Sequence, residues 1–159
     1  NPWGEEHTQD KVYMKINGKG TYRDFTCEDW KVDISLLGLT VPFGVYKAGD
    51  PMMEGTLKVV EQVLASPAGG LKRYENDEYA GGNPWLIAAL WAALYHIENR
   101  NFEKARQYFY WATECRTDLG LLPEQADKET GKPAWVIPLT WSHAMFVLVL
   151  EGLLEAGEI

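Results

Sequence analysis

Residues 85–95 read WLIAALWAALY, and this stretch has no polar face when it is arranged as an α-helix. A helix that is apolar on every side is buried on every side. It is too short to cross a bilayer, which takes about 20 apolar residues, so it must lie inside a larger helical assembly. Asn83 precedes it as the expected N-cap, and Pro84 as the expected first helical residue.

The helices on either side of residues 85–95 differ in character. Asp50 and Pro51 begin an amphipathic helix, and another amphipathic helix follows Asn101. Residues 139–154 form a last helix that is again nearly all apolar. The order amphipathic, apolar, amphipathic, apolar predicts an outer and an inner layer of paired helices, as in an all-α toroid. An ordinary bundle fits less well, because all of its helices would be amphipathic.

The helices are too few to close a ring, so residues 1–159 are expected to form part of a larger toroid. The positions expected to face inward, at helical spacing, are Met53, Leu57, Val60 and Leu64 in one amphipathic helix and Phe102, Ala105, Phe109 and Ala112 in the other. The expected outward positions of the first helix include Glu54, Lys58 and Glu61.

The first 32 residues follow a different pattern. Residues 12–16 and 21–25 alternate apolar and polar side chains about the glycine-containing residues 17–20. This pattern predicts a β-hairpin. We therefore expect residues 1–32 to be a short hairpin lead-in to an otherwise helical chain.

The composition excludes some classes of partner. Fifteen basic and 23 acidic residues give a net charge of -8, and 46% of the residues are hydrophobic, as in a folded protein. Such an acidic surface repels phosphate backbones and anionic lipids, so we expect no nucleic-acid and no membrane partner. Residues 1–6 do not resemble a signal peptide, and the compartment stays open.

The sequence gives no reason to expect a metal or an organic cofactor. The three histidines are scattered, and the glycines fall singly or in pairs rather than in a phosphate-binding loop. Cys27 and Cys115 either pair or are both buried as small apolar residues.

Three polar loops rich in aromatic residues carry the candidate chemistry, at residues 73–85, 121–133 and 138–143. Loops that lead into inner helices open at one end of a toroid, and the second loop runs directly into the third. All three are therefore expected to line one mouth. Carboxylates, an arginine and tryptophans at a common mouth suit a neutral polyhydroxylated ligand, which needs hydrogen bonds and ring stacking together.

These loops contain an ordered set of short motifs. They are Arg73-Tyr74, Asp77, Tyr79, Gly82-Asn83-Pro84-Trp85, Pro123-Glu124-Gln125, Thr130-Gly131 and Pro138-Leu139-Thr140-Trp141-Ser142. In order and spacing they resemble the glucoamylase family of glycoside hydrolases (family 15), strongly over residues 73–153 and more weakly over residues 33–50. The resemblance implies part of an (α/α)6 toroid that removes glucose from the non-reducing ends of starch-like α-glucans with inversion.

The resemblance also implies roles for individual residues. Glu124 corresponds to the general base, and Arg73 to the arginine that hydrogen-bonds sugar hydroxyls near the scissile bond. Residues expected to shape or line the sugar subsites are Asp77, Tyr79, Trp85 and Trp141. Gln125 would support the site from behind without touching the sugar.

Several of these residues also have a purely structural interpretation. Glu124 follows a Leu-Leu-Pro turn and would then be a surface carboxylate, while Arg73 would be an ion-pair partner of Glu75 or Asp77. The residues that would belong to the core are Trp85, Trp141 and His143. The resemblance favours the base role for Glu124.

The family's general acid, a Glu that follows a Trp well before the base, has no convincing counterpart. Residues 3–6, Trp-Gly-Glu-Glu, contain an extra glycine and lie too close to the helical part, so Glu5 and Glu6 are not expected to serve. We expect the chain to be the C-terminal part of the catalytic domain, completed by the missing N-terminal half of the same enzyme. Family members often have small polar residues where this chain has Trp-Val-Ile-Pro at residues 135–138, so hydrogen bonding around Glu124 is expected to differ.

Other functions stay open. A trehalase or a dextran α-1,6-glucosidase would share the base on the same scaffold. A glucoamylase-like domain kept for sugar binding or regulation would explain the missing acid. A helical toroid with unrelated chemistry, such as a polysaccharide lyase, would explain the alternating helices but not the ordered motifs.

Overall fold

The computed structural model describes residues 11–16, 21–26 and 31–159. It divides the chain into two units, Asn1–Lys31 and Val32–Ile159, and each is described by itself.

The first unit contains the expected hairpin. Strand β1 (Lys11–Ile16) pairs antiparallel with strand β2 (Thr21–Thr26). Glu5, Glu6 and Cys27 lie outside the described residues.

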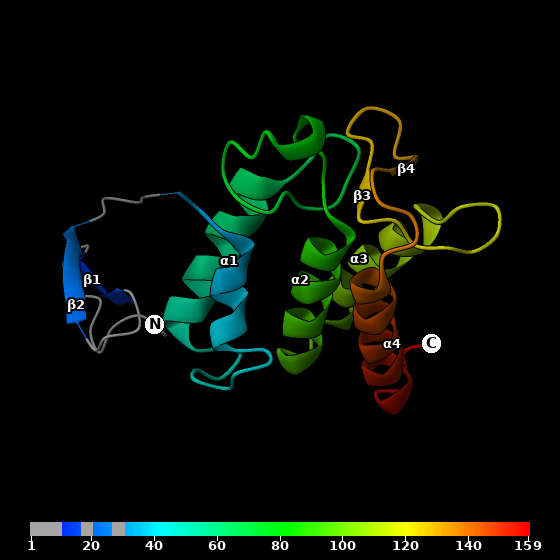
Figure 1. Ribbon diagram of the computed structural model, residues 1–159. Helices are drawn as coiled ribbons and strands as arrows, with labels where there is room; N and C mark the ends of the chain where they lie inside the picture. The colour runs from blue at the N-terminus through cyan, green and yellow to red at the C-terminus, as the bar shows by residue number, and fades with distance from the viewer. Residues whose placement is uncertain (1–10, 17–20, 27–30) are drawn as a thin grey trace. The chain divides into compact units, whose positions relative to one another are not determined.

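The second unit is helical. Its α-helices are α1 (Pro51–Leu64), α2 (Leu86–Glu98), α3 (Phe102–Glu114) and α4 (Thr140–Glu155). Two short 3-10 helices, η1 (Ile34–Leu39) and η2 (Tyr79–Gly81), and the paired strands β3 (Gln125–Ala126) and β4 (Pro133–Ala134) complete it. Helix α2 contacts η1, α3 and α4 and lies at the centre of this unit (Figure 1). The all-α architecture expected for this part is confirmed.

Helix α1 begins as the sequence predicts. The Asp50 side chain accepts a hydrogen bond from Met52 N at 2.9 Å, and Pro51 occupies the first helical position, where its missing N–H costs nothing. The four residues predicted to face inward are buried: Met53, Leu57, Val60 and Leu64. In α3, Ala105, Phe109 and Ala112 are likewise buried, and Phe102 is partly buried.

Glu61 departs from the expected outer face of α1. Its Oε1 lies 3.0 Å from His96 Nε2 of α2 and accepts a hydrogen bond from Tyr108 Oη of α3 at 2.8 Å. Burial acts to raise the pKa of Glu61, but the hydrogen bonds from His96 and Tyr108 and the charges of His96 and Lys104 hold this pKa below its usual value. One carboxylate therefore ties three helices together.

Replacing Tyr108 by Phe is expected to lower the free energy of unfolding by about 1.5–3 kcal/mol, because the lost hydrogen bond was made to a charged group. A Tyr110→Phe control on the exposed side of α3 should stay within about 0.5 kcal/mol of the parent. Since the folded-state pKa of Glu61 is lowered, its stabilisation is present above the unfolded-state pKa and is lost as pH falls through the folded-state pKa. Urea titrations at several pH values would measure both effects, and equal midpoints for the two variants would contradict the network.

The start of α2 corrects two expectations. Pro84 is not the first helical residue, and Asn83 does not cap the helix. Its Nδ2 donates to Ala80 O at 3.1 Å and to Gln125 Oε1 at 3.2 Å. The reason is that Trp85 stays extended, with its N–H bonded to Leu71 O at 2.9 Å, so the helix begins only at Leu86.

Helix α4 is less covered than its sequence predicts. Only Ser142, Val149 and Leu153 of this helix are buried, whereas Trp141 and Leu148 are about half exposed. An apolar groove of about 560 Å³ runs between α2 and α4. Its apolar lining includes Phe43, Trp91, Leu94, Trp141, Met145 and Leu148. Among the described residues, no helix combines the length and apolar character needed to span a membrane.

We expect the chain by itself to associate with other copies, because an exposed apolar surface of this kind is rarely left open in a stable monomer. Leu148→Lys on the open face of α4 should shift the population toward monomer. Leu119→Lys, at an 85% exposed loop position, should not. Sedimentation velocity at micromolar concentration would measure this, and a monomeric parent chain would show that the open face does not drive association.

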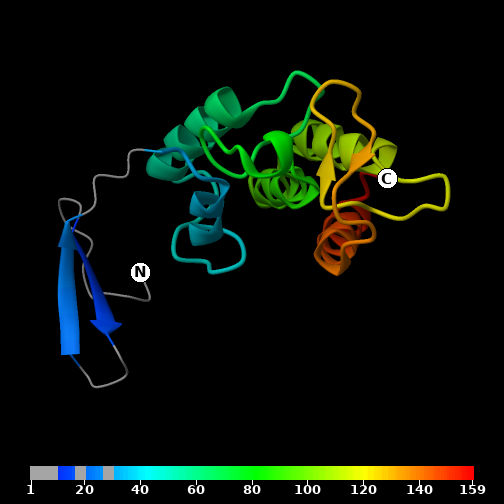
Figure 2. The same cartoon turned by 45° about the horizontal axis from the view of Figure 1, so that its top comes forward.

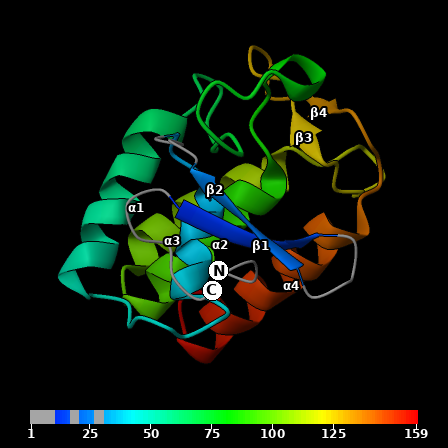
Figure 3. The same cartoon turned by 60° about the vertical axis from the view of Figure 1, so that its left-hand side comes forward.

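The polar loops gather at one end of the helices. In Figures 1 and 3 the segments that lead into α2 and α4 lie at the same end, and Figure 2 brings that end forward. Backbone hydrogen bonds join them, from Leu86 N to Glu124 O at 3.1 Å and from Leu139 N to Leu122 O at 3.0 Å. The three loops expected at one mouth are therefore adjacent.

Candidate active site

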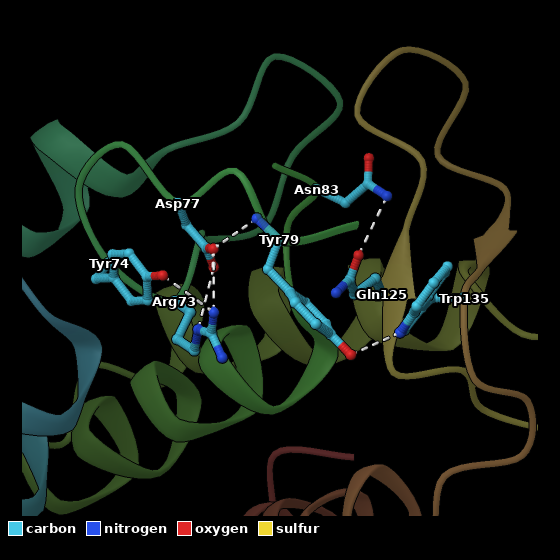
Figure 4. A network of polar contacts seen from close by, with 7 residues as sticks. All are labelled: Arg73, Tyr74, Asp77, Tyr79, Asn83, Gln125 and Trp135. Atoms are coloured by element: carbon cyan, nitrogen blue, oxygen red, sulfur yellow. Dashed lines mark hydrogen bonds and ion pairs between the residues drawn. The ribbon is translucent and has the colours of Figure 1, made fainter. Parts of the chain in front are cut away.

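A partly buried ion pair fixes the guanidinium at this mouth. Arg73 Nε donates to Asp77 Oδ2 and Arg73 Nη2 to Asp77 Oδ1, each at 3.1 Å. The Asp77 carboxylate is shielded from solvent and also accepts from Tyr79 N at 3.0 Å. Arg73 Nη2 donates to Tyr74 Oη at 3.2 Å as well. Figure 4 shows this network, which leaves the Arg73 side chain in one orientation.

Aromatic rings surround the same guanidinium. Its central carbon lies 4.7 Å from the ring centroid of Tyr74, 4.7 Å from that of Trp85 and 5.2 Å from that of Tyr79. The rings of Tyr79 and Trp85 lie 5.8 Å apart. Trp85 is 6% exposed and Tyr79 is 45% exposed, so Tyr79 is the ring that a ligand can reach.

Glu124 enters this site from the segment before β3. Its backbone is held by two hydrogen bonds, from Glu124 N to Val136 O at 2.8 Å and from Leu86 N to Glu124 O. Its Oε2 is shielded from solvent and accepts no hydrogen bond from the residues that the structure describes. Burial raises the pKa of Glu124, and the positive charge of Arg73 offsets part of that rise.

Gln125 follows Glu124 at the start of β3. It is fully buried, and its Oε1 accepts from Asn83 Nδ2, which links the loop before α2 to β3 (Figure 4). His143 also supports the Glu124 segment, because its Nε2 accepts from Leu122 N at 3.2 Å. Ser142 Oγ donates to Pro123 O at 2.7 Å.

The structure does not bring Trp141 into the aromatic cluster. Within residues 31–159, Trp141 has no ring contact with Tyr79 or Trp85, and its side chain lines the apolar groove. Its neighbour in sequence, Ser142, bonds to the segment that carries Glu124.

Trp135 is a residue of this site for which the sequence offered no specific role. Its Nε1 donates to Tyr79 Oη at 2.9 Å, and the two rings meet edge to face with centroids 5.8 Å apart. The signal that pointed to this position was the departure of residues 135–138 from the small polar residues of the family. The sequence likewise gives Tyr74 no role of its own, and in the structure its hydroxyl accepts a hydrogen bond from Arg73 Nη2.

The arrangement can bind and activate a neutral ligand. A fixed guanidinium offers hydrogen-bond donors, aromatic rings offer a stacking wall, and a carboxylate with a raised pKa offers a proton acceptor. Among the described residues, no group of His, Cys, Asp and Glu side chains gathers as metal ligands.

Two archaeal relatives are similar in sequence. The chain is 36% identical over 133 residues to an uncharacterized glycosyl hydrolase of Methanocaldococcus jannaschii, a match that covers 76% of this chain. It is 29% identical over 130 residues to trehalase 2 of Sulfolobus acidocaldarius, covering 81% of this chain. The chain spans 22% of the length of each relative. No family model matches the chain.

Solved structures share the fold. A glycosidase superposes with a TM-score of 0.73 at 24% identity, over 79% of this chain and 37% of that one. A bacterial glucoamylase complexed with acarbose superposes with a TM-score of 0.65 at 27% identity, over 91% of this chain and 23% of that one. Together with the helical layers, these similarities identify the chain as part of a glucoamylase-like (α/α) toroid.

Proposed function

We propose that this chain carries the general base of an inverting, exo-acting α-glucosidase that releases glucose from the non-reducing ends of starch-like oligosaccharides and polysaccharides. The observation that carries the proposal is Glu124, whose Oε2 is buried without a hydrogen-bond partner among the described residues and whose charge interacts with that of Arg73. The similarity to a glucoamylase bound to acarbose supports a glucan substrate.

Inverting hydrolysis places a water between a carboxylate and the anomeric carbon. The carboxylate takes a proton from the water while the water oxygen attacks, and a second carboxyl group about 6.5–9.5 Å away protonates the leaving oxygen. In this proposal Glu124 Oε2 accepts the proton. Its raised pKa makes it a stronger base than an exposed glutamate, provided that the pH keeps it ionised.

Arg73 would hold the sugar. Its Nε and Nη2 are used by Asp77 and Tyr74, whereas its Nη1 donates to none of the described residues and is available for a sugar hydroxyl. Tyr79 would form the apolar wall against the pyranose ring, and the buried Trp85 would shape the subsite by packing against Tyr79. Gln125 would keep the Glu124 segment in place from behind. Trp141 would line a further subsite from the apolar groove, apart from the Tyr79–Trp85 pair.

The general acid is proposed to come from the missing N-terminal half of the same enzyme. The curated relatives extend well beyond the matched region, because the chain spans about a fifth of their length. This half would also supply the cover for the open face of α4. The complete enzyme is therefore the form in which turnover is expected.

A trehalase is the second candidate function. The similarity to trehalase 2 of Sulfolobus acidocaldarius favours it, and an inverting trehalase would use the same base and the same fixed arginine. The two candidates differ on the leaving side of the scissile bond, where the leaving sugar is joined through its 4-hydroxyl in a starch-like glucan and through its anomeric hydroxyl in trehalose.

A substrate panel tests the proposal. Maltotetraose, isomaltose and trehalose would be supplied to the complete enzyme at equal concentration, with an E124Q variant as the inactive control. We expect maltotetraose to be hydrolysed at least about tenfold faster than the other two, a gap of about 1.4 kcal/mol in activation free energy. Faster trehalose hydrolysis would favour the trehalase. Binding without turnover of any sugar would favour a domain kept for sugar binding or regulation.

The charge of Arg73 is expected to determine the pH below which activity is lost. Glu124 must be ionised to accept a proton, so kcat/KM falls as pH falls through its pKa. Because Arg73 lowers that pKa, Arg73→Gln should move the acid limb of the pH–rate profile to higher pH. Arg73→Lys keeps the charge and should leave the limb near its original position, although kcat/KM falls with loss of the two-point contact to Asp77. A limb that stays in place in Arg73→Gln would contradict the assignment of Glu124 as the titrating group.

A further inference from the structure

Trp135 has an unusual backbone conformation for a large residue. Its φ of 64° lies in the left-handed region, which is costly for any residue with a Cβ and is usually taken by glycine. Burial does not compensate for that cost, because the side chain is 57% exposed. Strained residues of this kind cluster at functional sites, where another requirement keeps the side chain in place.

The position of Trp135, close to the proposed base, gives a functional reason for keeping its side chain there. Gln125 pairs with Ala134 in the β3–β4 ladder, and Glu124 N donates to Val136 O at 2.8 Å. Trp135 therefore lies in the segment directly opposite the proposed base.

The contacts of Trp135 show which part of its indole is available. The Nε1–H is already used by Tyr79 Oη at 2.9 Å, and the two rings stand at 82° to each other (Figure 4). Tyr79 in turn packs against Trp85 and over the Arg73 guanidinium. Trp135 thus fixes the orientation of Tyr79, and much of its own surface stays open to solvent.

We propose that Trp135 is a sugar-stacking residue at the rim of this site, which binds a pyranose ring of an α-linked glucan on its exposed indole surface and positions Tyr79 through its N–H. The proposal rests on the proposed function for the kind of ligand. An exposed indole with its polar atom already paired offers a flat apolar surface, which suits the C–H face of a sugar ring. A residue that only packed against Tyr79 would have no need to leave more than half of its surface exposed.

Trp135→Gly is the decisive variant, because glycine accepts the observed φ without strain while the ring is removed. Trp135→Phe keeps a ring but loses the donor to Tyr79, and Tyr79→Phe removes the acceptor of the same bond. Tyr110→Ala, which deletes a half-exposed aromatic ring on α3, is the matched control.

Calorimetric titration with maltotetraose would be performed on the complete enzyme in an E124Q background, so that the sugar is not consumed. We expect Trp135→Gly to raise Kd at least about tenfold with little change in thermal midpoint, and Tyr110→Ala to leave Kd unchanged. Trp135→Phe and Tyr79→Phe should each raise Kd two- to threefold (about 0.4–0.65 kcal/mol), and the double variant should be no worse than either, because all three lose one shared hydrogen bond.

The outcomes separate this inference from the proposed function. Equal Kd values for Trp135→Gly and its parent, or no binding of maltotetraose by the parent, would overturn the stacking role. The opposite result is also distinguishable: maltotetraose binding depends on Trp135, but the enzyme with Glu124 intact hydrolyses none of the three test sugars. That result would leave the stacking role in place and overturn the proposed hydrolysis.

Discussion

Replacing Glu124 by Gln in the complete enzyme should lower kcat on maltotetraose by at least about 1000-fold, within the range that general-base catalysis contributes. KM should change little, because the amide fills the same space and Arg73 still offers its donors. The loss follows from the chemistry of Oε2, a buried oxygen that accepts no hydrogen bond from the described residues. The amide of the variant cannot take a proton from water as this carboxylate oxygen can. Steady-state rates on maltotetraose would measure it.

The control for this variant is Glu129→Gln. Glu129 is an exposed carboxylate five residues further along the same loop, and its loss should leave kcat within about twofold. Added azide gives a second check, because this anion can attack the anomeric carbon without a base and should restore turnover in E124Q as β-glucosyl azide. An E124Q enzyme that is as active as its parent would show that another group is the base.

Replacing Asp77 by Ala should lower kcat/KM about 100-fold or more, the scale expected when a binding group loses its orientation. Asp77 accepts three hydrogen bonds, two from Arg73 and one from Tyr79 N. Its removal therefore frees the guanidinium that is proposed to bind the sugar and the backbone of Tyr79, the ring proposed to face it. The free energy of unfolding should also fall, by about 1.5–3 kcal/mol for each hydrogen bond to a charged group that is not replaced by water.

Glu78→Ala is the matched control for Asp77→Ala. It removes the neighbouring carboxylate of the same loop, which is exposed rather than buried. Kinetics on maltotetraose and thermal unfolding of both variants would separate the two carboxylates. If Glu78→Ala and Asp77→Ala were equally active, the Arg73–Asp77 pair would have no part in binding.

Local signals in the sequence predicted those parts of the fold that local chemistry decides. Asp50 and Pro51 begin α1 because a side-chain cap and a missing N–H suit the first helical turn whatever surrounds them. The apolar stretch of residues 85–95 predicted the central helix because no exposed position could accommodate it.

Contacts between distant segments decided what the sequence could not predict. Asn83 has the residue type of an N-cap, but the pairing of Trp85 with Leu71 delays α2, and Asn83 binds Gln125 instead. The exposure of α4 depends on what covers its apolar face, which hydropathy alone does not report.

In the candidate site, too, the sequence predicted some features, and others depended on contacts between distant segments. Arg73, Asp77, Tyr79, Trp85 and Glu124 were expected at one mouth, and the structure brings their segments together. Trp135 had no assigned role, because its significance depends on a left-handed φ and a hydrogen bond to a residue 56 positions away.

The anomeric form of the released glucose tests the central claim most directly. Proton NMR during the first minutes of maltotetraose hydrolysis by the complete enzyme would distinguish the two anomers before they equilibrate. If Glu124 activates a water for direct displacement, β-glucose appears first, because attack from the opposite face inverts the α-linkage. Initial release of α-glucose would mean a covalent intermediate and a nucleophilic carboxylate, and would contradict the role proposed for Glu124.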